Sequence, residues 1–341
     1  PHNTIYSIIH TKDNQIYIGT YNGLCRYVQA SGKFENILLP VNRGGSNLFV
    51  NSLLEDTTRQ CIWIGMEGYL FQYNPTTGEM KAIEVFHNNS IKSLALDGDE
   101  NLLAGTDNGL YVYQNDKEPL QHIIHDSRNI QSLTNNIIWN IFSDQEHNIW
   151  LGTDYGISLS RYNSALQFVP ISQITGTGDG NQFYSLFRDS KGFYWFGGTN
   201  GVLRFTHPAG NKHDAIWYRM GDKNYPLSHN RIRHIYEDRE QQLWIATDGS
   251  INRYDYNTHQ FVHYNIVDST GTYNTNWAYY LFEDTDGKLW IATCLGGIFV
   301  VDKHKLIQSA GKSYVADQNY SIHNGLSGMF INQIVPDAEG N

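Results

Sequence analysis

Short apolar runs separated by tight polar turns recur along the whole chain. The clearest copy runs from Asn276 to Val300, where an apolar run ending at Phe282 is followed by the turn 284–287, Asp-Thr-Asp-Gly, and by a second run centred on Trp290. Alternating apolar and polar positions predict β-strands, and Asp and Gly between such runs suit hairpin turns. Each copy is therefore predicted to be an antiparallel meander of short strands.

The copies align on one aromatic or apolar residue in the second strand, which we call the anchor. The anchors are Tyr17, Trp63, Leu103, Trp150, Trp195, Trp244 and Trp290, spaced 40 to 49 residues apart. A repeat of this length made only of short strands is typical of a β-propeller, because one such blade cannot bury both of its faces alone. We predict an all-β fold, a seven-bladed β-propeller of four-stranded antiparallel blades in residues 1–328. Residues 329–341 are predicted to be the first strand of a further, truncated repeat, so that the chain is a piece of a longer protein.

Two columns of polar residues recur with the anchors. An acidic column six residues before the anchor holds Thr11, Asp97, Asp144, Asp189, Asp238 and Asp284, with Asp56 one place further away, and an asparagine column eight residues earlier holds Asn3, Asn89, Asn136, Asn181, Asn230 and Asn276, with Leu48 in the second repeat. The asparagines are predicted to bond backbone groups where the chain enters the innermost strand. The acidic turns are predicted to be hairpins, because an EF-hand calcium loop needs more oxygen ligands.

The second and fourth strands are also visible in the pattern. Gly or Ala follows every anchor by two positions, which suits strands crowded against the next blade. The outer fourth strands are predicted near Phe34, Ile83, Ile123, Phe168, Trp217, Phe261 and Tyr314.

Residues that differ from repeat to repeat are the candidates for recognition. In a propeller the start of each inner strand and the turn after each second strand lie on one face, and at the inner-strand positions Trp139 and Trp277 exceed what the repeat needs. The full predicted ligand-binding set is Trp139, Tyr184, Arg231, Arg233, Trp277 and Tyr279 with the turn residues Asp154, Tyr155 and Asp248. Aromatic rings edged by guanidinium groups suit stacking on sugar rings or pairing with carboxylates. The alternative is that these side chains only fill the channel or pack between blades.

Composition narrows the function classes. The formal net charge is −10, from 24 Lys and Arg against 34 Asp and Glu, so the chain lacks the basic stripe that nucleic acid demands. No apolar run has the length of a membrane span, and the first residues show no signal-peptide pattern. Cys25, Cys61 and Cys294 have no paired spacing for zinc or for a disulfide framework. No metal and no cofactor is predicted.

Catalytic motifs are lacking as well. The sequence has no His-Glu-x-x-His, no Gly-x-Ser-x-Gly and no glycine-rich phosphate loop that opens a helix. No catalytic residue is predicted, and this chain is predicted not to be an enzyme. A propeller lyase or glycosidase, and a protein-interaction scaffold, remain the alternatives to a binding module.

The repeat resembles the regulator propellers of hybrid two-component sensors from gut Bacteroidetes. The segments 230–254 and 276–300 match the family pattern closely, and 3–27 and 136–159 nearly as well; the segment 320–326 resembles the linker before a late repeat of the second propeller. In that family two propellers, followed by a β-sandwich and a transmembrane helix, form the periplasmic half of a membrane histidine kinase.

The resemblance implies a periplasmic ligand sensor, whose parent protein is a histidine kinase. Many members sense fragments of complex polysaccharides and switch on the genes for using them. The expected partners are an oligosaccharide or other small ligand, the adjacent propeller and β-sandwich domains of the same chain, and a second copy of the parent in a homodimer. The kinase, receiver and DNA-binding parts are absent from this sequence.

Overall fold

The computed structural model describes residues 4–41, 48–83, 86, 89–114, 119, 121–162, 168–175, 181–206, 215–223 and 226–336. The chain divides into two compact units, residues 1–180 and residues 181–341. Nearly all regular structure in both units is β-strand, and within the described residues the α-helices are limited to two short segments.

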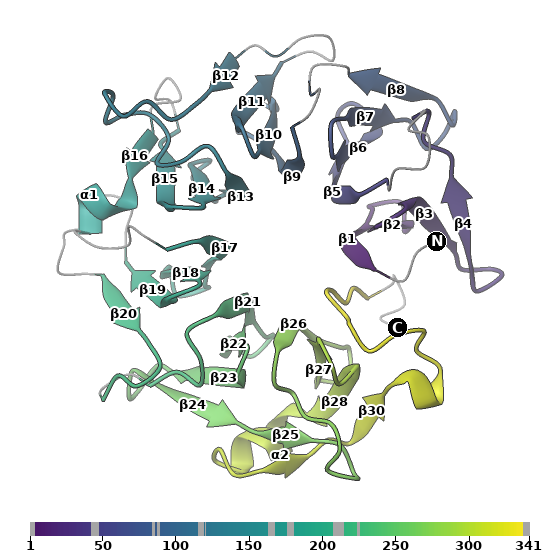
Figure 1. The fold of residues 1–341 in the computed structure, drawn as a ribbon. Coiled ribbons are helices and arrows are strands. Elements are labelled where there is room, and N and C mark those ends of the chain that lie inside the picture. Colours follow the sequence, from purple (N-terminus) through teal and green to yellow (C-terminus); the bar gives the residue numbers. More distant parts are fainter. Residues whose placement is uncertain are drawn as a thin grey trace. The chain divides into compact units, whose positions relative to one another are not determined.

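The first unit holds four four-stranded antiparallel sheets, which we call blades 1 to 4 (Figure 1). Their strands are β1 (Ile5–His10), β2 (Ile16–Thr20), β3 (Gly23–Val28) and β4 (Lys33–Ile37); β5 (Val50–Asp56), β6 (Cys61–Met66), β7 (Leu70–Tyr73) and β8 (Met80–Ile83); β9 (Ile91–Leu96), β10 (Leu102–Thr106), β11 (Gly109–Tyr113) and β12 (Gln121–Ile123); and β13 (Ile138–Ser143), β14 (Ile149–Thr153), β15 (Gly156–Ser160) and β16 (Phe168–Pro170). Helix α1 (Ile171–Thr175) follows blade 4.

The second unit holds three more four-stranded sheets, blades 5 to 7. Their strands are β17 (Phe183–Arg188), β18 (Tyr194–Gly198), β19 (Gly201–Phe205) and β20 (Ile216–Tyr218); β21 (Ile232–Glu237), β22 (Leu243–Thr247), β23 (Ser250–Asp255) and β24 (Gln260–Tyr264); and β26 (Ala278–Glu283), β27 (Lys288–Thr293), β28 (Ile298–Asp302) and β30 (Gln318–Tyr320). Blade 7 carries an insertion, helix α2 (Lys303–Gln308) and strand β29 (Tyr314–Val315), and β29 pairs in parallel with β25 (Ile266–Val267). A 3-10 turn, Ile322–Asn324, follows β30.

These sheets confirm the predicted fold class, a seven-bladed β-propeller of four-stranded antiparallel blades. Every blade has its strands in sequence order, and the anchors Trp63, Trp150, Trp195 and Trp244 are at most 1% exposed. One predicted outer strand was wrong. Tyr314 belongs to β29, and the fourth strand of blade 7 is β30, because the inserted α2 and β29 displace the outer strand along the chain.

The small residue after each anchor marks close packing between consecutive blades. A Cβ added to Gly65 of β6 would lie 2.6 Å from Cγ2 of Ile91 in blade 3, and one added to Gly197 of β18 would lie 2.4 Å from Cγ2 of Ile232 in blade 6. Carbon atoms do not approach so closely, so a side chain here would push the next blade away. The predicted crowding is confirmed within each unit.

The acidic column ties each turn to the buried anchor. Oδ1 of Asp144 accepts from the backbone N–H groups of Glu146 and Asn148 at 3.0 and 2.8 Å, and Oδ2 accepts from Nε1 of Trp150 at 2.8 Å. Equivalent bonds join Asp189 to Trp195, Asp238 to Trp244 and Asp284 to Trp290. The aspartates therefore serve the hairpin, as predicted, and they also satisfy the buried indole N–H.

Asparagines of the column bond backbone groups that follow the outer strand of the preceding blade. Oδ1 of Asn136 accepts from the N–H of His125 at 2.6 Å, and Oδ1 of Asn230 accepts from the N–H of Met220 at 2.7 Å. These bonds confirm that the column bonds the backbone in those two repeats, but the bonded N–H groups follow β12 and β20 and are not at the entry to the inner strand. Asn3 lies outside the described residues.

The segment after blade 7 begins in the place of another inner strand. Gly297 N–H donates to the carbonyl of Met329 at 3.1 Å, just as Gly109 donates to Asn136 and Gly201 to Asn230 at the previous blade junctions. The residues up to 336 form no assigned strand, and 337–341 lie outside the described residues. The further repeat in residues 329–341 stays a prediction.

Candidate functional site

A β-bulge in every inner strand positions the variable side chains. In each blade the pairing of the first two strands skips one residue, and the skipped residues are Tyr6, Asn51, Lys92, Trp139, Tyr184, Arg233 and Tyr279. A bulge leaves one residue unpaired and re-aims its side chain, and bulges are frequent beside functional sites. The inner-strand positions whose residues differ from repeat to repeat are therefore the positions at which the strand pairing is interrupted by a bulge.

Turn residues lie beside these inner strands, as predicted. The N–H of Asp154 donates to the carbonyl of Ile137 at 3.0 Å, and the N–H of Asp248 donates to the carbonyl of Arg231 at 3.2 Å. These bonds hold the turn after the second strand against the start of the first strand in the same blade. The two sets of residues therefore share one edge of each blade.

In the first unit, the predicted residues gather around Trp139. Its indole Nε1 donates to Oδ1 of Asp154 at 3.0 Å, and Nζ of Lys92 in blade 3 lies 4.4 Å from the centre of its ring. Tyr155, beside Asp154, is 55% exposed. We call Lys92, Trp139, Asp154 and Tyr155 the blade 4 cluster.

In the second unit, Arg233 connects blades 6 and 7. Its Nε and Nη2 donate to the two carboxylate oxygens of Asp248 at 2.7 and 3.2 Å, and its guanidinium carbon lies 4.3 Å from the centre of the Tyr279 ring. This bidentate pair fixes the guanidinium plane, and both side chains are largely buried. Phe330 also contacts Tyr279, with ring centres 5.2 Å apart.

Two further predicted residues remain open to solvent beside this pair. Arg231 is exposed, and among the described residues its guanidinium has no hydrogen-bond or carboxylate partner. Trp277 is 46% exposed and has a φ of 57°, in the left-handed region. A bulky residue in that region is strained, and such strain concentrates at functional sites. We call Arg231, Arg233, Asp248, Trp277 and Tyr279 the blade 6–7 cluster.

The structure brings eight of the nine predicted residues into these two clusters. Tyr184 lies in blade 5, where its hydroxyl donates to Oε1 of Gln182 at 2.6 Å. The sequence missed Lys92, Phe330 and Cys294, which contact the predicted residues. Burial raises the pKa of the Cys294 thiol, which also interacts with Tyr279. The position of Lys92 in the bulge column was the available signal.

His234, beside Arg233, closes the same junction through a neutral imidazole. Its Nδ1 accepts from the N–H of Leu281 in blade 7 at 3.2 Å, and its ring stacks on Tyr280 with centres 4.0 Å apart. Burial lowers the pKa of His234 to about 3. A protonated imidazole could not accept the Leu281 hydrogen bond, because both of its nitrogens would carry hydrogen.

Acid should therefore weaken this junction. The unfolded chain takes up a proton near the ordinary histidine pKa of about 6.5, while folded His234 stays neutral down to about 3. The contribution of neutral His234 to the free energy of unfolding is complete above about pH 6.5. Below that pH it falls by up to about 1.4 kcal/mol per pH unit. The free energy of unfolding, measured with denaturant at pH values from 7.5 to 4.5, should fall less steeply with decreasing pH for His234→Gln than for the unchanged chain. The glutamine amide oxygen can accept the same hydrogen bond but does not titrate. Equal slopes would contradict the assignment.

Among the described residues no three His, Cys, Asp or Glu side chains are grouped to hold a metal ion. No helix within the described residues has the length and apolar character needed to cross a bilayer.

Comparison with known proteins identifies the repeats and gives two informative relatives. The chain is 24% identical over 285 residues to "Histidine kinase P4" of Formosa agariphila, which covers 75% of this chain and 19% of the kinase. It is 83% identical, over its whole length and 46% of the other chain, to the solved extracellular domain of a B. thetaiotaomicron protein described as a putative hybrid two-component system and also as a putative one-component system, with a TM-score of 0.50. The chain thus spans less than half the length of either relative.

Likeness of fold alone extends further. Virginiamycin B lyase from Staphylococcus aureus is 13% identical, with a TM-score of 0.56 over 85% of this chain and 92% of the lyase.

The model for the two-component regulator propeller matches residues 1–22, 132–155, 177–200, 226–249 and 272–294. These five segments are the starts of blades 1, 4, 5, 6 and 7, where the asparagine, acidic and anchor columns lie. The chain belongs to the two-component regulator propeller family.

Proposed function

We propose that this chain is an extracytoplasmic ligand-sensing module of a hybrid two-component sensor and that it recognises an oligosaccharide. The observation that carries the proposal is the 83% identity, over the whole chain, to an extracellular domain described as part of a putative hybrid two-component system. In this proposal the domain is periplasmic, and the rest of the protein supplies the histidine kinase that receives the signal. The adjacent domains of that protein and a second copy of it are the partners.

The chemistry of the blade 6–7 cluster supports a carbohydrate ligand. Trp277 presents an exposed side chain directly before β26, and Tyr279 follows two residues later in that inner strand. Aromatic faces pack on the C–H faces of sugar rings, while Arg231 provides unpaired donors for hydroxyl or carboxylate groups. The Arg233 and Asp248 pair holds its own geometry without a ligand, so that the surface is already formed before binding.

Signalling follows from the same contacts. Arg233 belongs to blade 6, Tyr279 to blade 7 and Phe330 to the segment after blade 7, so a ligand that moves Tyr279 acts on three consecutive parts of the chain. A ligand shifts such an arrangement only by its difference in affinity for the two states. We propose that this difference is how binding reaches the next domain.

The strained backbone of Trp277 gives a sharp test. We expect Trp277→Gly to raise the free energy of unfolding by up to about 1 kcal/mol, because glycine adopts a positive φ without strain. The same change should weaken oligosaccharide binding at least about tenfold, as loss of a central aromatic contact does. The measurement is a thermal-shift screen of glycan fragments, in which a specific ligand raises the melting temperature by mass action.

The control is Phe34→Ala, which removes an exposed aromatic side chain from the outer strand of blade 1. It should leave every ligand-dependent shift unchanged. Survival of every ligand shift in Trp277→Gly would place recognition elsewhere, and no shift from any glycan would leave a protein-interaction scaffold. Turnover of a bound fragment would establish the enzyme alternative instead.

A further inference from the structure

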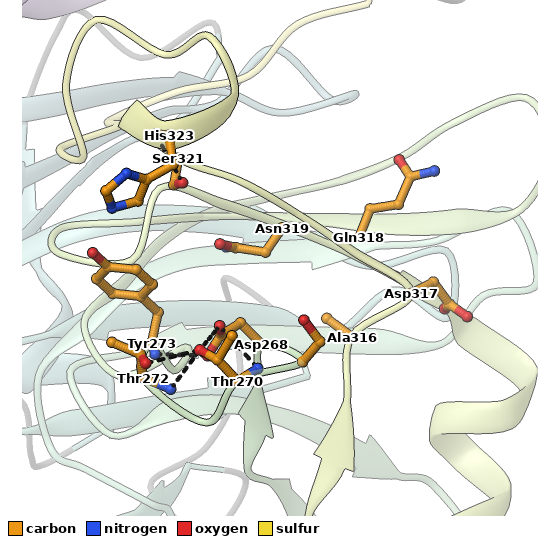
Figure 2. A pocket seen from close by; sticks show the side chains of 11 residues that line it. Asp268, Thr270, Thr272, Tyr273, Ala316, Asp317, Gln318, Asn319, Ser321 and His323 are labelled. Atoms are coloured by element: carbon orange, nitrogen blue, oxygen red, sulfur yellow. Dashed lines mark hydrogen bonds between the residues drawn. The ribbon is translucent and has the colours of Figure 1, made fainter.

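A cavity of about 400 Å³, lined mainly by residues with polar side chains, lies in the second unit, apart from the residues of the blade 6–7 cluster. One wall is the loop 268–273, between β25 and β26, and the other is the segment 316–323, which includes β30 (Figure 2). The volume is within the range of about 300 to 1,000 Å³ that small-molecule sites occupy. The repeat pattern does not predict this cavity, because the loop lies between two repeats and the insertion in blade 7 displaces β30 from its predicted place.

The loop is held in shape by its own aspartate. Asp268 is 7% exposed; its Oδ1 accepts from the N–H of Tyr273 at 2.7 Å, and its Oδ2 accepts from the N–H and hydroxyl of Thr270 at 3.2 and 2.5 Å. These hydrogen bonds outweigh burial, which acts in the opposite direction, and lower the pKa of Asp268. The Asp268 carboxylate therefore accepts hydrogen bonds from its own loop, and these bonds fix the shape of that wall of the cavity.

The opposite wall presents a fixed carbonyl oxygen. Nδ2 of Asn319 donates to the carbonyls of Gly296 and Ile298 at 2.9 and 3.3 Å, which fixes the orientation of the amide. Its Oδ1 has no hydrogen-bond partner within the described residues, and Figure 2 shows it directed toward the Tyr273 ring. The Tyr273 ring stands at one end of the cavity, with the imidazole of His323 above it.

The lining indicates the class of ligand. The residues around the cavity include hydroxyls, amides, one imidazole and one aromatic ring, and no Lys or Arg. Its two acidic residues already accept hydrogen bonds, Asp268 within the loop and Asp317 from the N–H of Asp302 at 2.6 Å. Two carboxylates with no lysine or arginine disfavour an anion, whereas neutral hydroxyl groups can both donate to and accept from such a lining.

We propose that this cavity binds one neutral sugar ring, which packs on Tyr273 and hydrogen-bonds to Oδ1 of Asn319 and to the imidazole of His323. This site is separate from the blade 6–7 cluster and does not depend on the function proposed for that cluster. A pyranose offers the apolar C–H face and the ring of hydroxyl donors and acceptors that these three side chains match.

The test is saturation-transfer NMR and calorimetry with the methyl glycosides of glucose, galactose and mannose, and with glucuronic acid as the anionic comparison. We expect at least one neutral glycoside to bind and glucuronic acid to bind more weakly. Thr272→Trp, at an exposed position of the lining, should block the cavity and abolish binding. Tyr273→Phe removes only the hydroxyl and should weaken binding by no more than about tenfold.

Thr258→Trp is the matched control, because Thr258 is exposed in the turn between β23 and β24 and does not line the cavity. It should bind the same glycoside as the unchanged chain. Binding of no neutral glycoside, binding that survives Thr272→Trp, or tighter binding of glucuronic acid would each overturn the proposal. Trp277→Gly should leave this binding intact, so that failure at one site is distinguishable from failure at the other.

Discussion

Replacing Asp189 by alanine should lower the free energy of unfolding by about 3 to 5 kcal/mol. The carboxylate is 4% exposed and accepts four hydrogen bonds. Two come from the backbone of its own turn, one from Nε1 of Trp195 at 2.8 Å and one from the hydroxyl of Tyr256 at 2.8 Å. Alanine would leave the buried indole N–H of Trp195 without an acceptor, and a buried donor without a partner costs about 1 to 3 kcal/mol by itself.

Tyr256 makes this position more sensitive than a simple hairpin. It follows β23 in blade 6, so its bond to Asp189 joins that blade to the turn of blade 5. Burial and the bond to the Asp189 carboxylate both raise the pKa of Tyr256, which keeps its hydroxyl a donor at every ordinary pH. The substitution therefore removes a turn, an anchor bond and a contact between blades together.

Asp99→Ala is the matched control for this prediction. Asp99 occupies the second acidic place in the turn of blade 3, it is exposed, and its carboxylate makes no hydrogen bond within the described residues. We expect a change within about 0.5 kcal/mol. Chemical denaturation of the two variants, each compared with the unchanged chain, measures the difference. Equal losses would mean that the acidic column acts through turn propensity alone.

The fold was predictable because the same spacing of turn and anchor residues recurs in each repeat. An anchor such as Trp195 recurs at a fixed distance from an aspartate, and a structure of identical short meanders has few ways to bury them. What the sequence did not show is that the aspartate bonds the anchor. Hydrophobic spacing locates the strands, but it does not say which side chain accepts from an indole six residues away.

The candidate site was predictable in part for the same reason. Departures from the repeat singled out Trp139, Arg233 and Tyr279, and the structure shows that all three are bulge residues. The left-handed backbone of Trp277 could not be predicted, because a bulky residue gives no signal of positive φ. The cavity beside Asp268 was missed because one wall lies between two repeats, and the other includes β30, the outer strand that the insertion in blade 7 displaces from its predicted place.

The insertion in blade 7 illustrates the same limit more strongly. The predicted fold is all-β, yet α2 places Lys303 where it is fully buried, with Nζ 2.6 Å from Oε1 of Glu283 and 3.3 Å from Oδ2 of Asp238. Burial alone lowers the pKa of Lys303, but its hydrogen bond to Glu283 and the two negative charges outweigh burial and raise the pKa. From sequence, a charged residue in an insertion is expected to be exposed to solvent. The burial of Lys303 depends on the packing of α2, which the sequence pattern does not predict.

Lys303→Ala should therefore cost about 3 to 5 kcal/mol of the free energy of unfolding, as removal of one partner from a buried ion pair does. Glu283, 3% exposed, and Asp238, 4% exposed, would keep buried negative charges without a cation. Lys305→Ala is the control on the same helix: its Nζ lies 3.4 Å from Asp302 and its side chain is 64% exposed, so the loss should stay below about 1 kcal/mol.

A second pair of variants separates the charge from the packing of the lysine stem. Lys303→Met keeps an unbranched apolar chain but leaves the carboxylates unpaired, so it should still be strongly destabilising. Adding Glu283→Gln removes one buried charge. In the unchanged chain the backbone N–H of Arg239 donates to Oε2 of Glu283 at 2.8 Å, and the glutamine amide oxygen can accept the same hydrogen bond. The double variant should be more stable than Lys303→Met by at least about 1 kcal/mol in denaturant unfolding. If it is instead less stable, the inserted helix is held by the packing of Lys303 and Leu306, and the buried charges do not decide its position.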